Sequence, residues 1–197
     1  MRLPTLLIGI CLIILIPVSG FSTTSRDQEP VHSVQADFVQ EKHLQILNRP
    51  IISTGTFAFQ GPGSLRWEYL TPIPSILLLH NGNIRKFVKK DGNLREDRGI
   101  GLDAMQLMLG EISNWLVGRF TDNDIFTTSF PDKQTIILKP RGKSLAGLIS
   151  KIELKPSEQK GVLDSVTIFE GSDSYTRMTF SNTVINKNIP DALFTGK

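Results

Sequence analysis

The sequence predicts a mainly β protein, in which one domain is built on a single antiparallel sheet with one amphipathic helix inserted between its strands. Two observations support this prediction, namely short segments in which apolar and polar residues alternate, and turn-forming sequences that separate those segments. Roughly ten such strands fit into the domain. They cover residues 36–46, 55–59 and 65–69, the arms of hairpins centred on 81–82 and 91–92, and residues 125–130, 134–139, 151–154, 163–169 and 175–183.

The N-terminal residues are set aside from the fold because they have the pattern of a targeting signal. Arg2 precedes an apolar run over residues 6–18, and small residues follow at 18–20. The run holds about 13 residues, whereas a membrane-spanning helix needs roughly 20. This pattern predicts a secretory signal peptide, residues 1–20, that is cleaved after Gly20. Cys11 lies within the run and lacks the small neighbours of a lipid-modified cysteine, so we interpret it as part of the signal.

Residues 21–30 form a polar stretch without periodicity that ends in Pro30, which is typical of a flexible arm. Residues 31–197 then form the predicted domain. The net charge of the chain is +3 with both signs dispersed, so the composition gives no reason to expect nucleic acid as a partner. We interpret one short basic cluster as part of a solvated hairpin; it comprises Arg85, Lys86, Lys89 and Lys90.

The first strand has an ambiguous start. The apolar residues whose spacing permits a short helix are Val31, Val34 and Phe38. Strand alternation begins at about Ala36, so this segment is expected to change from helix to strand. Further along, Gln40 and Lys42 interrupt the apolar face of the predicted strand.

The next strands are predicted on both sides of a break at residues 61–63. Residues 55–59 place Phe57 and Phe59 on one face of the first of them. In the second, apolar side chains alternate with charged ones: Leu65, Trp67 and Tyr69 with Arg66 and Glu68. Hairpins are predicted at 81–82 and 91–92, where Asn-Gly and Asp-Gly place glycine at a position that needs a positive φ.

One segment has helical periodicity. From Asp103, a plausible N-cap, apolar residues recur at helical spacing: Met105, Met108, Leu109, Ile112 and Leu116. Trp115 lies beside this stripe. Gly110 lowers the intrinsic stability of the helix by about 1 kcal/mol relative to alanine. The helix is therefore expected to depend on packing against the sheet, from which it could swing away.

No pattern in the sequence predicts catalysis, a cofactor or a metal site. His32, His43 and His80 are far apart and lack the spacing of metal ligands. Residues 157–160 match the S-x-x-K pattern of penicillin-recognising enzymes, but the flanking proline and glycine indicate a polar hairpin turn. We therefore predict a protein that is not an enzyme.

A resemblance to a known family rests on four segments in a fixed order. Residues 55–72 form a strand, a proline-containing turn and a strand that carries Arg-Trp and ends at a proline. The other segments are 36–40, 81–82 and 188–194. Together they cover almost the whole predicted domain and resemble the bacterial outer-membrane lipoprotein carrier (LolA) family. The resemblance implies an unclosed, strongly curved antiparallel half-barrel, with short helices as a lid over its apolar concave face.

The resemblance also implies a function. Members of the family are periplasmic carriers, which take acylated lipoproteins from an inner-membrane export complex to an outer-membrane acceptor. By this resemblance the protein is a monomer whose partner is an acylated lipoprotein or another lipid cargo. The residues that would line the cavity wall are Phe57, Phe59, Leu65 and Trp67. Those that would form the lid face are Met105, Met108, Leu109 and Ile112, in which unbranched methionines suit a cover that repacks around different chains.

The sequence departs from the family pattern at one position. Family carriers have an arginine immediately before the turn proline, which holds the lid closed, whereas this chain has Gly61 there. Arg66, four residues beyond Pro62, is the candidate for gating or partner contact. Three alternatives therefore stay open: an accessory protein for a specialised lipid or pigment export pathway, an envelope-stress sensor or interaction module of the same fold, and a periplasmic hydrolase.

Overall fold

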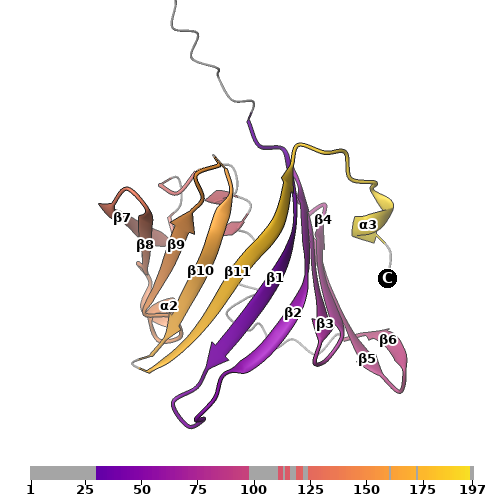
Figure 1. Ribbon diagram of the computed structural model, residues 1–197, viewed down its shortest axis with the longest axis horizontal. Coiled ribbons are helices and arrows are strands. Elements are labelled where there is room, and N and C mark those ends of the chain that lie inside the picture. Colours follow the sequence, from indigo (N-terminus) through magenta and orange to yellow (C-terminus); the bar gives the residue numbers. More distant parts are fainter. Residues whose placement is uncertain are drawn as a thin grey trace, which may run out of the picture.

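The structure of the protein is a computed structural model. The residues that it describes are 30–97, 111–112, 114–115, 119–121, 124–159, 161–171 and 173–195. In these residues, 11 antiparallel strands form one open, curved sheet in the order β6-β5-β4-β3-β2-β1-β11-β10-β9-β8-β7 (Figure 1). The predicted fold class, mainly β with one unclosed antiparallel sheet, is confirmed. The predicted signal peptide and almost all of the predicted arm lie outside the described residues.

The chain runs outward from the middle of the sheet and then returns to the middle from the far edge. Strands of the first half are β1 (Ser33–His43), β2 (Ile51–Gln60), β3 (Ser64–Thr71), β4 (Ser75–His80), β5 (Asn83–Lys90) and β6 (Asn93–Glu96). Those of the second half are β7 (Phe126–Asp132), β8 (Thr135–Pro140), β9 (Lys151–Pro156), β10 (Leu163–Glu170) and β11 (Ser174–Ile185). Two short helices, α2 (Lys143–Ala146) and α3 (Ala192–Thr195), belong to the second half.

The short helix that the spacing of Val34 and Phe38 permits does not form, because β1 starts at Ser33. Val34 pairs with Phe59 of β2 and with Ile185 of β11. Residues four apart share a face in a strand as well as in a helix, so this spacing fits both structures. Pairing with β2 and β11 gives the backbone N–H and C=O groups of β1 hydrogen-bond partners on both sides, and this favours a strand over a helix.

Both predicted hairpins have turn residues with positive φ angles. Asn81 and Gly82 have φ of 49° and 77°, and Asp91 and Gly92 have φ of 52° and 80°. Two successive residues with positive φ form the type of turn whose twist matches that of the strands it joins. The hairpins β4–β5 and β5–β6 are therefore confirmed.

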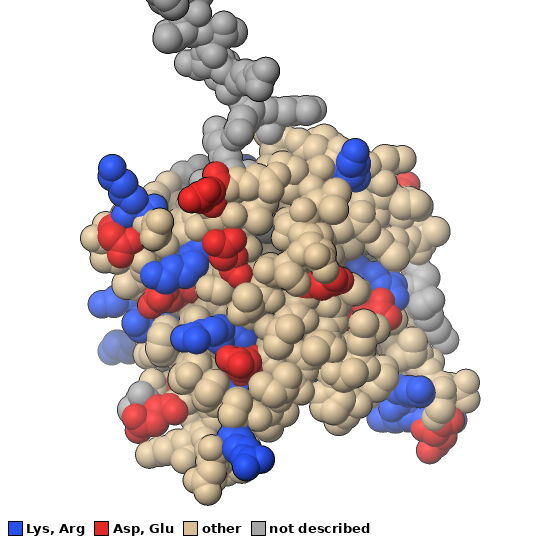
Figure 2. All heavy atoms as spheres, viewed as in Figure 1, with Lys and Arg blue, Asp and Glu red and all other residues tan. Residues whose placement is uncertain are grey.

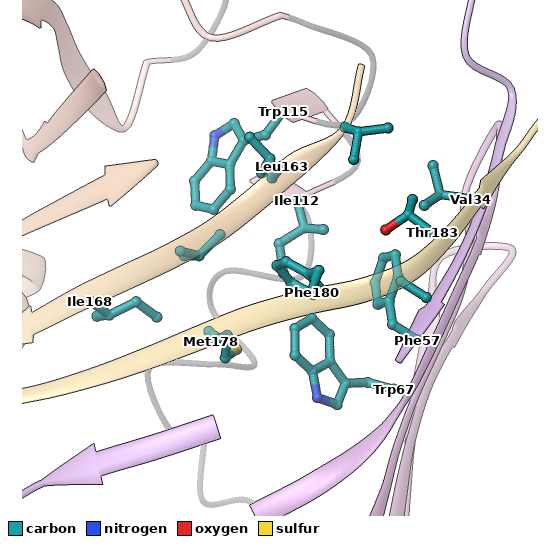
Figure 3. Close-up of a pocket in the computed structure, with 13 residues that line it drawn as sticks. Val34, Phe57, Trp67, Ile112, Trp115, Leu163, Ile168, Met178, Phe180 and Thr183 are labelled. Carbon is teal, nitrogen blue, oxygen red and sulfur yellow. The ribbon is translucent and has the colours of Figure 1, made fainter. Parts of the chain in front are cut away.

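The two faces of the sheet carry separate apolar clusters. The cluster that spans both halves of the sheet includes Phe38, Phe57, Leu65 and Trp67 from the first half. Val166, Ile168 and Met178 join it from β10 and β11. Figure 3 shows side chains of the two halves facing one another, which identifies this as the concave face. On the convex face lie two smaller clusters: Ala58 with Ile189 and Phe194, and Ile76, Leu78 and Phe87.

Gly55 permits the close packing beneath the aromatic side chains of the concave face. A Cβ atom at this position would overlap the backbone oxygen of Glu68 and lie 2.6 Å from the Phe38 ring. The Phe38 ring contacts Trp67 at 5.1 Å and Tyr69 at 5.2 Å between ring centroids. The absence of a side chain at Gly55 thus lets the Phe38 ring lie against the sheet.

We expect Gly55→Ala to destabilise the protein by at least about 1–3 kcal/mol, since overpacking a closely packed site forces side chains or backbone to shift. Gly142→Ala is the matched control, because a Cβ atom there meets no atom within 4 Å. Urea unfolding midpoints measure both effects. Equal midpoints for the two variants would show that the Phe38 packing does not depend on Gly55.

Candidate functional site

A small apolar cavity lies on the concave face, between the two halves of the sheet. Its volume is about 30 Å³. Strand residues from five strands and two helical residues surround it (Figure 3). The lining consists of Val34, Ala36, Phe57, Trp67, Ile112, Trp115, Val162, Leu163, Val166, Ile168, Met178, Phe180 and Thr183. Of these, only Thr183 carries a side-chain hydroxyl, and the two tryptophans carry N–H groups, so the cavity suits hydrocarbon.

Aromatic side chains pack against one another in one wall of the cavity. Trp67 is 1% exposed and contacts the Phe57 ring edge to face, with a distance of 5.2 Å between ring centroids. Phe180 of β11 lies 6.2 Å from Phe57 and 6.3 Å from Trp67. Such tilted and edge-to-face pairs stabilise the packing beyond the burial of apolar area alone.

Residues 111, 112, 114 and 115 are helical, and two of them, Ile112 and Trp115, line the cavity together with the strand residues. They belong to the helix predicted from Asp103, whose residues 103–110 lie outside the described residues. Ile112 is 8% exposed and Trp115 is 1% exposed, and both line the cavity. Trp115 also packs edge to face on Phe126 of β7, at 6.5 Å between ring centroids.

The structure brings together only some of the predicted site residues. Phe57 and Trp67 line the cavity, while Phe59 and Leu65 are buried in the same cluster away from it. Of the predicted lid residues, Ile112 lines the cavity, whereas Met105, Met108 and Leu109 lie outside the described residues.

Half of the cavity wall was not predicted from the sequence. Val166, Ile168, Met178 and Phe180 come from β10 and β11, and alternation in 163–169 and 175–183 was the available signal for them. That alternation could not show which side of the second half faces the first. Trp115 was also missed as a lining residue, although it stands three residues after Ile112.

Arg66 lies on the convex face, away from the cavity. Its Nε and Nη2 atoms bind Glu68 Oε2, both at 2.8 Å, and Nη1 donates a hydrogen bond to the Leu193 carbonyl at 3.1 Å. Phe194 beside it is buried against Ala58. Arg66 therefore holds the C-terminal segment with α3 against β2 and β3, which Figure 1 shows on the outside of the sheet.

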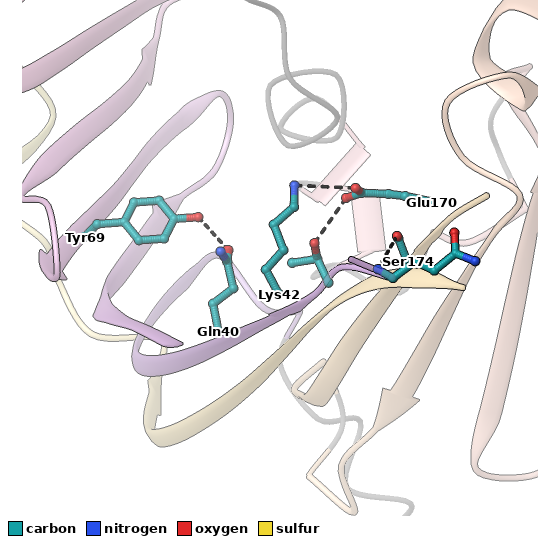
Figure 4. A network of polar contacts seen from close by, with 7 residues as sticks. Gln40, Lys42, Tyr69, Glu170 and Ser174 are labelled. Carbon is teal, nitrogen blue, oxygen red and sulfur yellow. Dashed lines mark hydrogen bonds and ion pairs between the residues drawn. The ribbon is translucent and has the colours of Figure 1, made fainter. Parts of the chain in front are cut away.

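Polar side chains occupy the other end of the concave face (Figure 4). Tyr69 Oη donates a hydrogen bond of 2.7 Å to Gln40 Oε1. Lys42 Nζ lies 3.4 Å from Glu170 Oε2, and the Thr176 hydroxyl donates to the other oxygen of Glu170 at 3.1 Å. Gln40 and Lys42, which interrupt the apolar pattern of β1, thus form part of a polar border. The concave face is apolar at one end and polar at the other.

Glu111 carries a buried carboxyl group and directly precedes Ile112, which lines the cavity. It is 8% exposed, and its Oε2 atom is buried without a hydrogen-bond partner. Burial raises its pKa above the ordinary value for glutamate, and a hydrogen bond from Asn114 opposes this to a lesser degree. In the described residues, no three His, Cys, Asp or Glu side chains are grouped to hold a metal ion. No helix in the described part of the chain is long and apolar enough to cross a membrane.

The raised pKa of Glu111 makes a pH-dependent contribution to stability. The folded protein binds this proton more tightly than the unfolded chain, so stability is lost as pH rises from the ordinary glutamate range through the folded pKa. We therefore expect Glu111→Gln to raise the urea midpoint at about pH 7 and to leave it nearly unchanged at about pH 3.5. Glu158→Gln, at an exposed carboxylate, is the control. A midpoint lowered at both pH values would contradict a desolvation cost at Glu111.

Comparison with known proteins places this fold in a family. The family model described as "Outer membrane lipoprotein carrier protein LolA" matches residues 29–197. Comparison with curated protein sequences gives no match.

Similar solved structures cover most of the chain. A DUF1329 family protein from Desulfovibrio piger has a TM-score of 0.46 and 11% identity, over 84% of this chain and 90% of that chain. A LolA superfamily protein from Nitrosomonas europaea has a TM-score of 0.44 and 12% identity, over 85% of this chain and 91% of that chain. The MucA/MucB complex of Pseudomonas aeruginosa gives a TM-score of 0.38 and 15% identity, over 84% of this chain and 56% of that chain.

The family match extends from just before β1 to the end of the chain, and so it includes every strand of the open sheet and the cavity between its halves. The protein therefore belongs to the outer membrane lipoprotein carrier protein LolA family.

Proposed function

We propose that the protein is a periplasmic carrier that shelters the acyl chains of lipoproteins, or of related lipids, on its concave face. The observation that supports this most directly is the apolar cavity between the sheet and the helical residues Ile112 and Trp115. Its lining offers dispersion contacts and excludes water, which is what a saturated hydrocarbon chain requires. In this proposal the partners are an inner-membrane complex that delivers the cargo and an outer-membrane acceptor that takes it.

The cavity is too small for an acyl chain in this structure, so cargo must displace part of its lining. It measures about 30 Å³, whereas an apolar cavity of about 150 Å³ accepts only a molecule the size of benzene. The strand residues that line it belong to a sheet in which backbone hydrogen bonds join neighbouring strands. The helical residues stand outside that sheet and are the part that we propose moves. Met105, Met108 and Leu109 would extend the same moving surface.

The free energies involved favour a long chain over a short one. Moving an acyl chain of about sixteen carbons out of water stabilises it by on the order of 12 kcal/mol. Exposing Ile112 costs about 1.5–3 kcal/mol, and exposing a tryptophan with about 250 Å² of buried area costs about 6 kcal/mol. A chain of about eight carbons gains only about 6 kcal/mol, which is less than the cost of opening.

We therefore expect long-chain acyl lipid to copurify with the native protein, as detected by mass spectrometry of extracted material. After delipidation, palmitate should bind and change tryptophan fluorescence, since Trp67 and Trp115 both line the cavity, whereas octanoate should not bind. Cargo identity then separates a lipoprotein carrier from an accessory protein of another lipid export pathway. If the native protein purifies without bound lipid and binds neither fatty acid, the result contradicts the proposed carrier function and favours an interaction module.

Paired substitutions test whether the helical residues are the moving part. Ile112→Asp should lower the melting temperature by only a few degrees and abolish palmitate retention, because its carboxylate can reach water when the cover opens. Ile168→Asp, at a cavity residue held in β10, should destabilise the protein by several kcal/mol, since it has no route to water. Thermal unfolding and palmitate binding are measured on the same samples. Equal destabilisation by both substitutions would mean that Ile112 is a permanent core residue.

A further inference from the structure

We propose that the tip of the β1–β2 hairpin is a membrane-contact element, which inserts Ile46 into the interface of an anionic lipid bilayer and places Arg49 among the headgroups. This inference goes beyond the proposed function, because it concerns a different surface and does not require cargo. It rests on the exposure, position and charge of the residues in and around the tip, which we define as residues 44–50.

The tip exposes apolar side chains that are not packed in the core of the protein. Ile46 is 87% exposed, and Leu47 is 44% exposed. Ile51 and Ile52, where β2 begins, are 43% and 45% exposed. Single exposed apolar residues are common on soluble proteins, but several contiguous ones on one projection mark an interaction site. A backbone hydrogen bond of 2.9 Å from Leu47 N to Leu44 O makes the turn compact.

The strand register shows that this hairpin extends beyond β3, whereas on its other side β11 accompanies β1 as far as His43. β3 ends where Thr71 pairs with Thr54, yet the β1–β2 ladder continues to the pair of Lys42 and Ile51. Two more exposed apolar residues lie beside it: Leu70 near the end of β3, at 51%, and Ile73 in the β3–β4 turn, at 64%. Figure 1 shows the hairpin as the lowest point of the sheet, and the corresponding lobe in Figure 2 is mostly uncharged.

The charges at this end are suited to anionic headgroups. Arg49 is exposed, and the interactions of the described residues give it no acidic partner. Lys89 and Lys90, also exposed, end β5 at the same side, where Lys89 N donates to the Pro74 carbonyl at 3.0 Å. The acid that follows them, Asp91, lies 3.7 Å from Arg95. Cations thus lie in the tip and on its β5 side, while the exposed Asp173 lies on its β11 side. An apolar turn with basic side chains beside it is the pattern of a segment that lies in the membrane interface.

The shape of the tip favours a bilayer over a protein partner. A stable protein interface buries about 800 Å² on each side, whereas the tip is one narrow turn. A bilayer accepts a single projecting side chain while nearby basic side chains reach its headgroups. The same end of the concave face carries the polar border of Lys42 and Glu170. Contact through the tip would therefore bring that border against the headgroups.

The test is flotation with vesicles of phosphatidylethanolamine, with or without phosphatidylglycerol, using native protein whose N-terminus is determined by mass spectrometry. All variants share that N-terminus, so its contribution cancels. Ile46→Ser should weaken binding by about tenfold, the loss expected for one isoleucine side chain that no longer leaves water. Arg49→Gln should weaken binding by about fivefold with phosphatidylglycerol and low salt, and little without them. The matched control is Ile84→Ser, 48% exposed beside the β4–β5 turn at the opposite end, which should bind like the wild type.

Three results would overturn the proposal: no binding to either vesicle, equal effects of Ile46→Ser and Ile84→Ser, or a dimer in sedimentation velocity that Ile46→Ser abolishes. The last result would assign the tip to a second copy of the chain. Palmitate binding is measured on the same variants, which should all retain it. A wild-type protein that binds palmitate but no vesicle thus refutes the proposal for the tip alone, and a wild-type protein that binds vesicles but no palmitate refutes the carrier alone.

Discussion

The antiparallel pairing of the first strand with the last is the interaction on which this structure depends. β1 pairs with β2 on one side, from Ser33 to Lys42, and with β11 on the other, from Val34 to His43. This pairing fixes the position of the second half of the chain relative to the first. It brings the Phe180 ring to 6.2 Å from the Phe57 ring, measured between ring centroids, although the two residues are 123 positions apart in the sequence. Without it, each half would expose an apolar face with nothing opposite.

An open sheet has two apolar faces to cover, and this protein covers them by different means. On the convex face, the C-terminal segment is fixed by directional contacts, in which Arg66 binds the Leu193 carbonyl and Gln60 Oε1 accepts from Ile189 N at 3.3 Å. On the concave face, Ile112 and Trp115 contribute apolar side chains. Apolar attraction is non-directional, so hydrocarbon from another molecule can replace it. The convex face is thus covered by a segment held through hydrogen bonds, and the concave face by apolar side chains that lipid can replace. This arrangement suits a protein that we propose binds and releases lipid.

Local pattern was sufficient to predict the strands and the hairpins, since alternation and Asn-Gly turns are properties of neighbouring residues. The family resemblance, and not the local pattern, placed Phe57 and Trp67 together on the cavity wall. The second half of the wall depends on long-range pairing, and an irregularity makes it harder to predict: the register shifts between Gln35 and Asp37, which pair with Val184 and Ser181. Phe180 and Thr183 therefore both line the cavity although they are three residues apart. The burial of Glu111 has no local pattern at all.

The pairing of β1 with β11 also has a consequence for how the chain acquires its structure. Contacts between residues so distant in sequence give the fold a high contact order, which slows folding because a long loop must close first. During synthesis β1 emerges well before its second partner strand, because β2 to β10 lie between them in the sequence. Until then the edge of β1 offers unpaired backbone groups, which could pair with another chain. We therefore expect the incomplete chain to associate with other chains through the edge of β1 unless it is kept apart from them until β11 has been synthesised.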